Sequence, residues 1–378
     1  MLRRQAALDR KLELARADSR LHDILRLGAY QLRAQARVPA YAAVSTSVDL
    51  AREAIGEDAA RYVNQALRRL IRETRNGTRE TSEGTHPRWL VARWRRSFGA
   101  AESARLVSWN DTTPALTIQP ARWSKEVLAR ALREAGFGVE DAPYDAGLRV
   151  THGDHASRLP FPVHLPGFAE GGFVVQDAAH ALVCRYAGLA PGAQVYDACA
   201  APGGKAVTLE RLGARVVAGD ARRDRIGRLT ETVGRCGVAI RVVAADLLSA
   251  PLAAASLDVV LVDAPCSATG TMARHPDARW RVSEHAITRA AERQRRLMEA
   301  AARLVKPGGV LVYATCSLEP EENSAIVNDF LARYAGLGRE PATGAVPAAL
   351  LTAEGDFQSL PQRHGMDGAY AARLVRAR

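Results

Sequence analysis

From Gln176 onward, apolar runs of strand length alternate with stretches of helical pattern. The five runs are AQVYDACAA, ARVVAGD, IRVVAAD, LDVVLVDAP and GGVLVYATC. Strands that are apolar on both faces and separated by helices are typical of a parallel sheet covered on two sides. The sequence therefore predicts a doubly wound α/β domain. Ligands of such domains bind beyond the carboxyl ends of the strands, so the residues after each run are candidate site residues.

The first run ends in a loop that contains two adjacent glycines, DACAAPGGKA, at residues 197–206. Gly203 and Gly204 allow a tight turn, which brings backbone N–H groups close to a ligand at the start of a helix. The full dinucleotide signature GxGxxG is absent from the chain. The loop alone therefore indicates a ligand site without naming the ligand.

An acidic residue ends each of the next three runs. Asp220 stands 23 residues after Asp197, about where an acid that hydrogen-bonds ribose hydroxyls is expected. Asp246 could face an adenine amino group, and Asp263 ends the fourth run. One such acid is often only a surface helix cap, but four in register outline an adenosine-shaped pocket. Because no phosphate-binding loop of the GxxxxGKS/T type accompanies them, the pocket favours S-adenosylmethionine over a nucleoside triphosphate.

The N-terminal part has a different pattern. Between Leu21 and Ile71, apolar residues recur at every third or fourth position, which predicts amphipathic helices packed together. The polar stretch RNGTRETSEGTHP is typical of a linker, and a mixture of helical and strand-like pieces follows it. We therefore expect a helical domain at 1–75, a linker at 76–87, a small α+β segment at 88–175 and the α/β domain at 176–378.

Positive charge is concentrated near the N-terminus. Residues 1–100 hold 20 Lys and Arg against 11 Asp and Glu, whereas the rest of the chain holds 32 against 30. Arginine dominates, and its planar guanidinium suits phosphate contacts. RNA or DNA is therefore a reasonable partner. An arginine-rich codon bias that merely solvates helix faces accounts for the same charge equally well.

Several classes of protein are disfavoured by composition. The sequence has no apolar stretch of about 18 residues and no apolar signal-peptide region, so we expect a cytoplasmic protein without a membrane partner. The five cysteines include no CxxC pair, which argues against a disulfide framework and against a four-cysteine zinc site. Reduced thiols and no metal site are expected.

Three long motifs carry a resemblance to a known family. They are DACAAPGGKA, VDAPCSATG with RHPDARW after it, and YATCSLEPEEN. Together they closely resemble the RNA cytosine-5 methyltransferases of the NOL1/NOP2/Sun family. The helical module looks like a NusB-type RNA-binding domain, as in the bacterial Sun branch that methylates 16S ribosomal RNA. The resemblance implies a Rossmann-like methyltransferase domain, S-adenosyl-L-methionine as cofactor, and RNA, 16S ribosomal RNA in particular, as partner.

The resemblance also implies roles for individual residues. Cys316 would be the nucleophile, and Cys266 would assist release of the product. Cofactor contacts are implied at Cys199, Ala200, Ala201, Pro202, Gly203, Gly204 and Lys205, with Asp220, Asp246 and Asp263 completing the pocket.

The chain departs from the family pattern in a few places. Residues 117–119 are Thr-Ile-Gln where the family usually has Arg-Val-Asn, and His180 replaces a usual serine after Gln176 and Asp177. These changes bear on RNA contacts rather than on the cofactor site. A NusB-like domain would also need helices before Met1, so we expect either an abbreviated domain or an internal start.

Chemistry gives an independent reason for the thiol in YATCSLEPEEN. Carbon 5 of cytosine is too electron-poor to attack a sulfonium methyl group, but a thiolate added at carbon 6 turns it into an enamine carbon that can. Cysteine is intrinsically nucleophilic, and its thiolate fraction rises near positive charge. Asp263 could hydrogen-bond the base, and Cys266 could take part when the carbon 5 proton is removed. Cys184 and Cys236 lack such motifs and are expected to be small buried hydrophobes.

Parts of the sequence are also compatible with other functions. A methyltransferase acting on an exocyclic amine would carry an Asn/Asp-Pro-Pro-aromatic motif, and DAPC lacks the aromatic residue, which disfavours that class. The chain could instead be a catalytically silent RNA-binding assembly or antitermination factor. Within the favoured class, Cys266 could attack in place of Cys316, because DNA cytosine-5 methyltransferases carry their nucleophile in a Pro-Cys pair.

Overall fold

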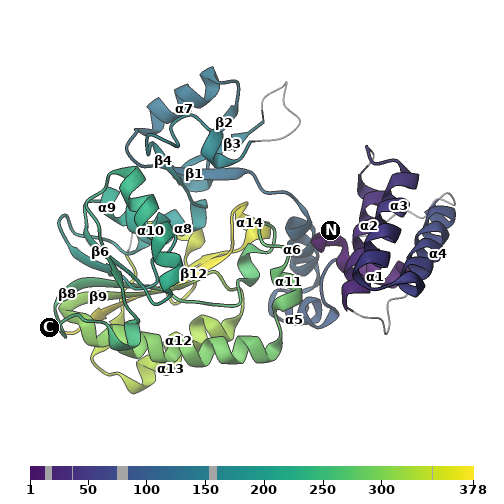
Figure 1. The fold of residues 1–378 in the computed structure, drawn as a ribbon. Helices are drawn as coiled ribbons and strands as arrows, with labels where there is room; N and C mark the ends of the chain where they lie inside the picture. The colour runs from purple at the N-terminus through teal and green to yellow at the C-terminus, as the bar shows by residue number, and fades with distance from the viewer. Residues whose placement is uncertain (13–18, 36, 75–83, 153–159, 343) are drawn as a thin grey trace. The chain divides into compact units, whose positions relative to one another are not determined.

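The computed structural model of the chain describes residues 1–12, 19–35, 37–74, 84–152, 160–342 and 344–378 (Figure 1). These residues form two compact units. The first holds Met1–Thr112 and His275–Arg281, and the second holds Thr113–Arg274 and Val282–Arg378. Within the described ranges, no helix is long and apolar enough to cross a membrane.

The described part of the first unit is helical. Leu25, Val63 and Leu67 are fully buried in a core that α2, α3 and α4 share, so the amphipathic helices predicted between 21 and 71 are present. The helices are η1 (Leu2–Arg4), α1 (Gln5–Leu12), α2 (Ser19–Ala34), α3 (Ala40–Ala54), α4 (Glu57–Thr74), α5 (Arg88–Phe98), α6 (Ala100–Asp111) and α11 (Ala278–Arg281).

A buried polar cluster joins the end of α6 to α11. The fully buried Arg279 guanidinium donates to Asp111 Oδ1 at 2.7 Å, to the carbonyl of Thr85 at 3.3 Å and to the carbonyl of Asn110. Burial, followed by the Arg279 charge, lowers the pKa of His86 to about 3 and keeps its imidazole neutral. The last residues of the predicted linker 76–87 therefore lie inside this unit, while 76–83 lie outside the described residues.

Residues 88–111 form two helices of the first unit, whereas the sequence grouped them with an α+β segment at 88–175. These two helices belong to the first unit because their side chains Leu90, Trp94 and Leu106 are buried within it. The first strand comes later, at β1 (Leu116–Pro120). The domain boundaries stay a prediction, and the compact units divide at Thr112.

A small antiparallel sheet opens the second unit, with strand order β2-β3-β1-β4. Leu128 and Leu132 of α7 (Lys125–Glu134) pack on it, together with Ile118 and Phe173. The other elements of this part are β2 (Gly138–Asp141), η2 (Pro143–Asp145), β3 (Leu148–Thr151), η3 (Pro162–His164) and β4 (Phe173–Val175).

The large sheet of the second unit has the strand order β10-β12-β9-β8-β5-β6-β7, and β11 pairs with β12. β7, β6, β5, β8 and β9 are parallel, whereas β12 and β10 run antiparallel to their neighbours. The chain order reverses beside β5, which creates the switch point where such sheets bind ligands. The strands are β5 (Gln194–Asp197), β6 (Arg215–Asp220), β7 (Arg241–Ala244), β8 (Leu257–Asp263), β9 (Val305–Thr315), β10 (Leu337–Arg339), β11 (Phe357–Ser359) and β12 (Ala369–Arg376).

Helices cover both faces of this sheet (Figure 1). Val195 of β5 packs in the core with α8, α9 and α10, and its neighbour Tyr196 packs in the opposite core with α12 and α13. The alternation confirms the predicted doubly wound α/β fold. The helices of this unit are α8 (Ala178–Tyr186), α9 (Gly204–Arg211), α10 (Arg223–Cys236), α12 (Glu284–Leu304), α13 (Ser324–Arg333) and α14 (Pro361–His364), with short turns η4 (Leu247–Ser249), η5 (Thr269–Thr271), η6 (Pro320–Glu322) and η7 (Ala348–Leu350).

Candidate active site

The glycine loop connects β5 to α9 in a tight turn. The N–H of Ala200 donates to the carbonyl of Gly219 at 2.9 Å, and the N–H of Gly203 donates to the carbonyl of Ala200 at 2.7 Å. Gly203 adopts a φ of +110° at the start of α9, which L side chains rarely adopt. A Cβ on Gly204 would lie 3.6 Å from the side chain of Gln176, an ordinary contact. The fold therefore requires glycine at 203, and at 204 it would tolerate a Cβ.

Two of the predicted acids lie next to this loop. Asp220 is buried at the end of β6, where Oδ2 accepts from the N–H of Ala201 at 3.3 Å and Oδ1 accepts from the N–H of Arg222 at 2.9 Å. Asp246 is exposed after β7, and its Oδ1 accepts from the N–H of Leu248 at 3.0 Å. Both carboxylates cap backbone turns at the carboxyl edge of the sheet, which leaves their part in ligand binding as a prediction.

Asp197, the first of the four strand-end acids, is a candidate to which the motifs gave no individual role. Its side chain is fully buried at the end of β5, and among the described residues its carboxylate has no side-chain donor and only a weak contact with the backbone N–H of Cys199. Burial, with a further contribution from the Asp263 charge, raises the pKa of Asp197 to about 7. A buried carboxylate without a side-chain donor is costly, so a cationic ligand group would be stabilised there. The ammonium group of S-adenosylmethionine is such a group.

Gln176 is a second such candidate. Its Oε1 accepts from Thr208 Oγ1 at 2.6 Å, while its buried Nε2 donates to no group in the described part of the chain. Gln176 stands beside Gly204, at the start of the same loop helix. An amide donor and a carboxylate, neither with a side-chain partner, suit the carboxylate and the ammonium of an amino acid. The residues present therefore fit the methionine end of the predicted cofactor.

Lys205 connects the glycine loop to the end of β8. Its Nζ lies 2.7 Å from Asp263 Oδ2. Burial lowers the pKa of Lys205, but the charge and the hydrogen bond of Asp263 outweigh it and raise that pKa to about 12. His180 of α8 is near this ion pair, and burial, followed by the Lys205 charge, lowers its pKa to about 4. A cation, an anion and a neutral imidazole therefore occur together at this strand end.

The two predicted catalytic cysteines are brought together by the register of neighbouring strands. Asp263 at the end of β8 is opposite Ala314 of β9, so the residues that follow the two strands meet. Cys266 Sγ and Cys316 Sγ are 3.1 Å apart, and both thiols are free. The hydrogen bond with Cys316, and then burial, raise the pKa of Cys266 well above its ordinary value. The raised pKa favours the neutral thiol at Cys266, and either sulfur can be the donor in this contact.

The other three cysteines lie in the interior. Cys184 and Cys236 are fully buried, as expected of small hydrophobes. Cys199 belongs to the glycine loop with Ala200, Ala201 and Pro202, and burial raises the pKa of its thiol. Each of these thiols is therefore held in its neutral form.

Glu322 binds both cysteine-bearing loops. It is fully buried and accepts from Ser267, which follows Cys266, and from Ser317, which follows Cys316. The motif YATCSLEPEEN contains Glu322, but no role could be read from its position in the sequence. Its partners come from the loop after β8 and from α12 as well, and only the fold brings these segments together.

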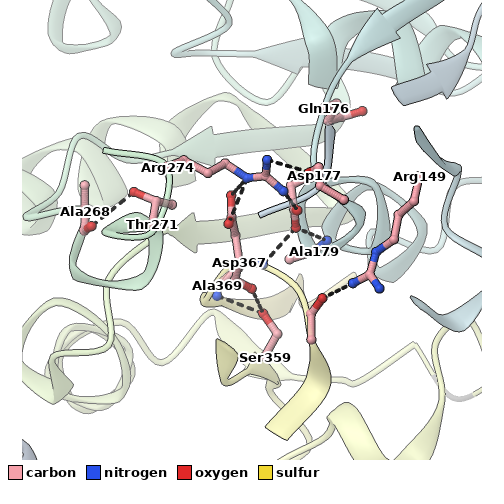
Figure 2. Close-up of polar contacts among 12 residues, drawn as sticks. Arg149, Gln176, Asp177, Ala179, Ala268, Thr271, Arg274, Ser359, Asp367 and Ala369 are labelled. Atoms are coloured by element: carbon pink, nitrogen blue, oxygen red, sulfur yellow. Dashed lines mark hydrogen bonds and ion pairs between the residues drawn. The ribbon is translucent and has the colours of Figure 1, made fainter. Parts of the chain in front are cut away.

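Arg274 holds the chain that leads away from Cys266 (Figure 2). Its guanidinium donates to Asp177 Oδ2 at 2.6 Å, to Asp367 at 3.0 Å and to the carbonyl of Ala115 at 3.0 Å. Asp177 also caps α8 and accepts from the N–H of Asp367 at 3.0 Å. Burial, followed by the Asp177 charge, raises the pKa of Asp367. One guanidinium thus joins the start of α8, the segment before β12 and the small sheet.

Residues 117–119, where the chain departs from the family pattern, are buried in β1. Gln119 Nε2 donates to the carbonyl of Ala146 at 2.9 Å and to the carbonyl of Gln176 at 3.3 Å. These side chains therefore have a structural role in the small sheet.

Comparison with known proteins agrees with the resemblance carried by the motifs. A family model described as 16S rRNA methyltransferase RsmB/F matches residues 188–375, and a NusB family model matches residues 2–72. The whole chain is 34% identical to the probable ribosomal RNA small subunit methyltransferase B of Synechocystis sp., and the alignment covers 89% of that protein.

Solved structures agree in fold. The crystal structure of PH0851 has a TM-score of 0.84 and 25% identity, over 99% of this chain and 87% of that one. The structure of NSun6 from Pyrococcus horikoshii with SFG has a TM-score of 0.66 and 20% identity, over 77% of this chain and 98% of that one.

Proposed function

We propose, because the chain belongs to the RsmB/F family of 16S rRNA methyltransferases, that it methylates carbon 5 of a cytosine in 16S ribosomal RNA. The proposed route is a covalent adduct between Cys316 Sγ and carbon 6 of the base. The observation that carries this route is the pair of free thiols, Cys266 and Cys316, 3.1 Å apart beyond two adjacent parallel strands.

The cofactor is S-adenosyl-L-methionine, which supplies an electrophilic methyl group when it is bound. Asp197 would hold its ammonium group, and the Nε2 of Gln176 would donate to its carboxylate. Asp220 would hold the ribose, and Asp246 would face the adenine. Gly203 and Gly204 would let the loop backbone approach the methionine end of the molecule closely.

The Cys316 thiolate starts the reaction by forming a bond to carbon 6, and the π electrons of the 5,6 double bond shift into the ring. Lys205 Nζ has further N–H donors besides the one directed at Asp263, so it can donate to the base where negative charge develops. Carbon 5 then takes the methyl group and loses its proton to a base. The electrons of that C–H bond restore the double bond, and the sulfur–carbon bond breaks.

Cys266 assists the last step in this scheme. Its Sγ lies 3.1 Å from Cys316 Sγ and carries a proton, so it can hydrogen-bond the departing thiolate. The reverse assignment would make Cys266 the nucleophile, and either thiol must lose its proton before it attacks. The resemblance of YATCSLEPEEN to the family motif favours Cys316 as the attacking group.

A catalytically silent assembly or antitermination factor is the other candidate. Its function would need neither a pair of aligned thiols nor a buried carboxylate beside the glycine loop. The alternative therefore does not explain the paired thiols or the buried carboxylate of Asp197.

Bisulfite sequencing of 16S ribosomal RNA tests the proposal. A strain that lacks the gene should lose one protected cytosine, and the wild-type gene should restore it, whereas Cys316→Ala should not. If the 16S ribosomal RNA of the deletion strain kept every protected cytosine, cytosine-5 methylation of this substrate would be ruled out. Restoration by Cys316→Ala would rule out the proposed nucleophile.

A further inference from the structure

The carboxylate of Glu322 lies behind the thiol pair and contacts the residue after each cysteine. Glu322 Oε1 accepts from the N–H of Ser267 at 2.9 Å, and Oε2 accepts from Ser317 Oγ at 2.5 Å and from Ser267 Oγ. The two serine hydroxyls are themselves 3.1 Å apart. A single side chain therefore fixes the backbone next to Cys266 and next to Cys316.

Gln294 of α12 completes the arrangement from a third element. Its Nε2 donates to Glu322 Oε1 at 3.1 Å and to the carbonyl of Pro265 at 3.0 Å. Pro265 immediately precedes Cys266, so the cysteine is held on both sides. Glu322 and Gln294 are both fully buried, which makes these contacts insensitive to solvent.

The Glu322 site is built for an ionised carboxylate. Its partners are one backbone N–H, one amide and two hydroxyls, and each serine has one proton to donate. Burial raises the pKa of Glu322 above its ordinary value, and the hydrogen bonds from Ser267, Ser317 and Gln294 offset only part of that rise. The charge of Glu322 in turn adds to the effects of Cys316 and burial that raise the pKa of Cys266.

We propose that Glu322 is a positioning residue that sets the separation of the two thiols and places its charge beside the loop that carries Cys266, which leaves Cys316 as the nucleophile. The inference rests on the function proposed above, because it explains which of two adjacent thiols attacks. Glu322 acts through the cysteine loops and does not contact the substrate in this scheme.

Three variants separate the geometric effect from the charge. Glu322→Gln keeps the shape and an acceptor oxygen but removes the charge. Glu322→Ala removes both. Glu321→Gln makes the same chemical change at the adjacent, exposed position and is the matched control. Thermal unfolding and S-adenosylmethionine affinity of each variant report whether the fold is intact.

The measurement is the rate of iodoacetamide alkylation of each cysteine against pH, without RNA, read by peptide mass spectrometry. In Glu322→Gln, the alkylation profile of Cys266 should move to lower pH, so that at a fixed pH below the midpoint Cys266 reacts faster than in the wild type. Glu321→Gln should follow the wild type. With RNA, Glu322→Gln should lower kcat and leave KM for RNA and cofactor affinity unchanged, and Glu322→Ala should lower kcat further.

An unchanged Cys266 profile in Glu322→Gln, with the fold intact, would overturn the proposed effect of the Glu322 charge. Full kcat in Glu322→Ala would overturn the positioning role. The proposed function fails in a different way, because wild-type protein would then form no methylcytosine and no RNA adduct whatever its thiol profile. The RNA-free alkylation profile therefore tests Glu322 independently of the methylation assay.

Discussion

At the scale of single residues, Cys266 and Cys316 have different proposed roles. Cys316 would form the bond to carbon 6, and Cys266, whose sulfur lies 3.1 Å away, would assist its departure. Cys316→Ala should therefore abolish methylation and leave no covalent RNA complex. Cys266→Ala should still permit attack and methyl transfer but slow the departure of the thiolate, so that protein joined to RNA accumulates. Denaturing gels of each variant with substrate RNA make the comparison.

Cysteine-to-serine variants are the control for this comparison, because they keep the size of the side chain. An adduct in Cys316→Ala and none in Cys266→Ala would reverse the assignment of the two thiols. Adducts in neither variant, together with active wild-type protein, would argue against covalent catalysis.

Asp197 should make both stability and cofactor binding depend on pH. Burial raises its pKa to about 7 from an unfolded value of 3.8, so folding takes up a proton between these limits. The contribution of Asp197 to the free energy of unfolding of the cofactor-free protein should therefore be highest below pH 4 and should fall as the pH rises to 7. Asp197→Asn should raise Tm at pH 8 and change it little at pH 4. Differential scanning calorimetry at the two pH values checks this.

Cofactor binding adds a second readout for Asp197. The ionised carboxylate would pair with the ammonium group, so wild-type affinity for S-adenosylmethionine should rise as pH increases through 7. Asp197→Asn should bind weakly at both values. Equal pH dependence in the two proteins, measured by calorimetry, would mean that Asp197 has a partner other than the cofactor.

Motif reading could find residues whose chemistry follows from type and place, such as Cys266, Cys316 and Asp220. It could not give Asp197 or Glu322 an individual role. The significance of Asp197 lies in a missing side-chain donor, and that of Glu322 lies in partners contributed by other elements. Whether a buried polar group has hydrogen-bond partners is decided by the folded structure, so it cannot be read from the sequence.

At the scale of elements, the site depends on how closely three loops cross. The N–H of Gly270 donates to the carbonyl of Cys316 at 2.9 Å. The carbonyl of Gly270 accepts from the N–H of Gly368 at 2.8 Å. A Cβ on Gly270 would lie 2.5 Å from the carbonyl oxygen of Gly368 and 2.8 Å from that of Cys316, and neither backbone atom can give way cheaply. The loops after β8 and β9 and before β12 therefore meet only because residue 270 is glycine.

Gly270→Ala should lower the free energy of unfolding by roughly 1–3 kcal/mol, as overpacking usually does, and should lower kcat by separating the cysteine loops. Gly227→Ala is the control, because Gly227 lies on α10 with nothing within 4 Å of the added Cβ. That change should be neutral or stabilising. Urea unfolding and single-turnover methylation give the two quantities, and wild-type stability in Gly270→Ala would contradict the close crossing.

The parallel sheet could be predicted because its strands are apolar on both faces, as Val195 and Tyr196 show. The unit to which residues 88–111 belong could not be predicted. The pattern of an amphipathic helix shows that one face is apolar, but it does not show which hydrophobic core that face packs against. Arg279 completes that helical unit from a distant part of the sequence. Sequence pattern identifies elements better than it assigns them to a unit.

At the scale of the whole molecule, the uneven charge bears on how RNA is bound. Residues 1–100 hold 20 Lys and Arg against 11 Asp and Glu, whereas the rest of the chain holds nearly equal numbers of basic and acidic residues. Arg68 of α4 and Arg95 and Arg96 of α5 are exposed, and in the described part of the chain no acid pairs with them. They are therefore available for phosphate contacts.

Replacing Arg68, Arg95 and Arg96 with glutamine should weaken RNA binding and reduce its dependence on salt. Each lost phosphate contact should lower the slope of log K against log salt by about 0.7–0.9, so three contacts would lower it by roughly two to three. S-adenosylmethionine affinity should not change, since the cofactor site is built from other residues. Arg333→Gln is the control, because Arg333 already pairs with Glu299 and Asp329. If the triple variant kept the wild-type salt slope in filter-binding titrations, these arginines would only solvate their helices, as a codon bias would predict.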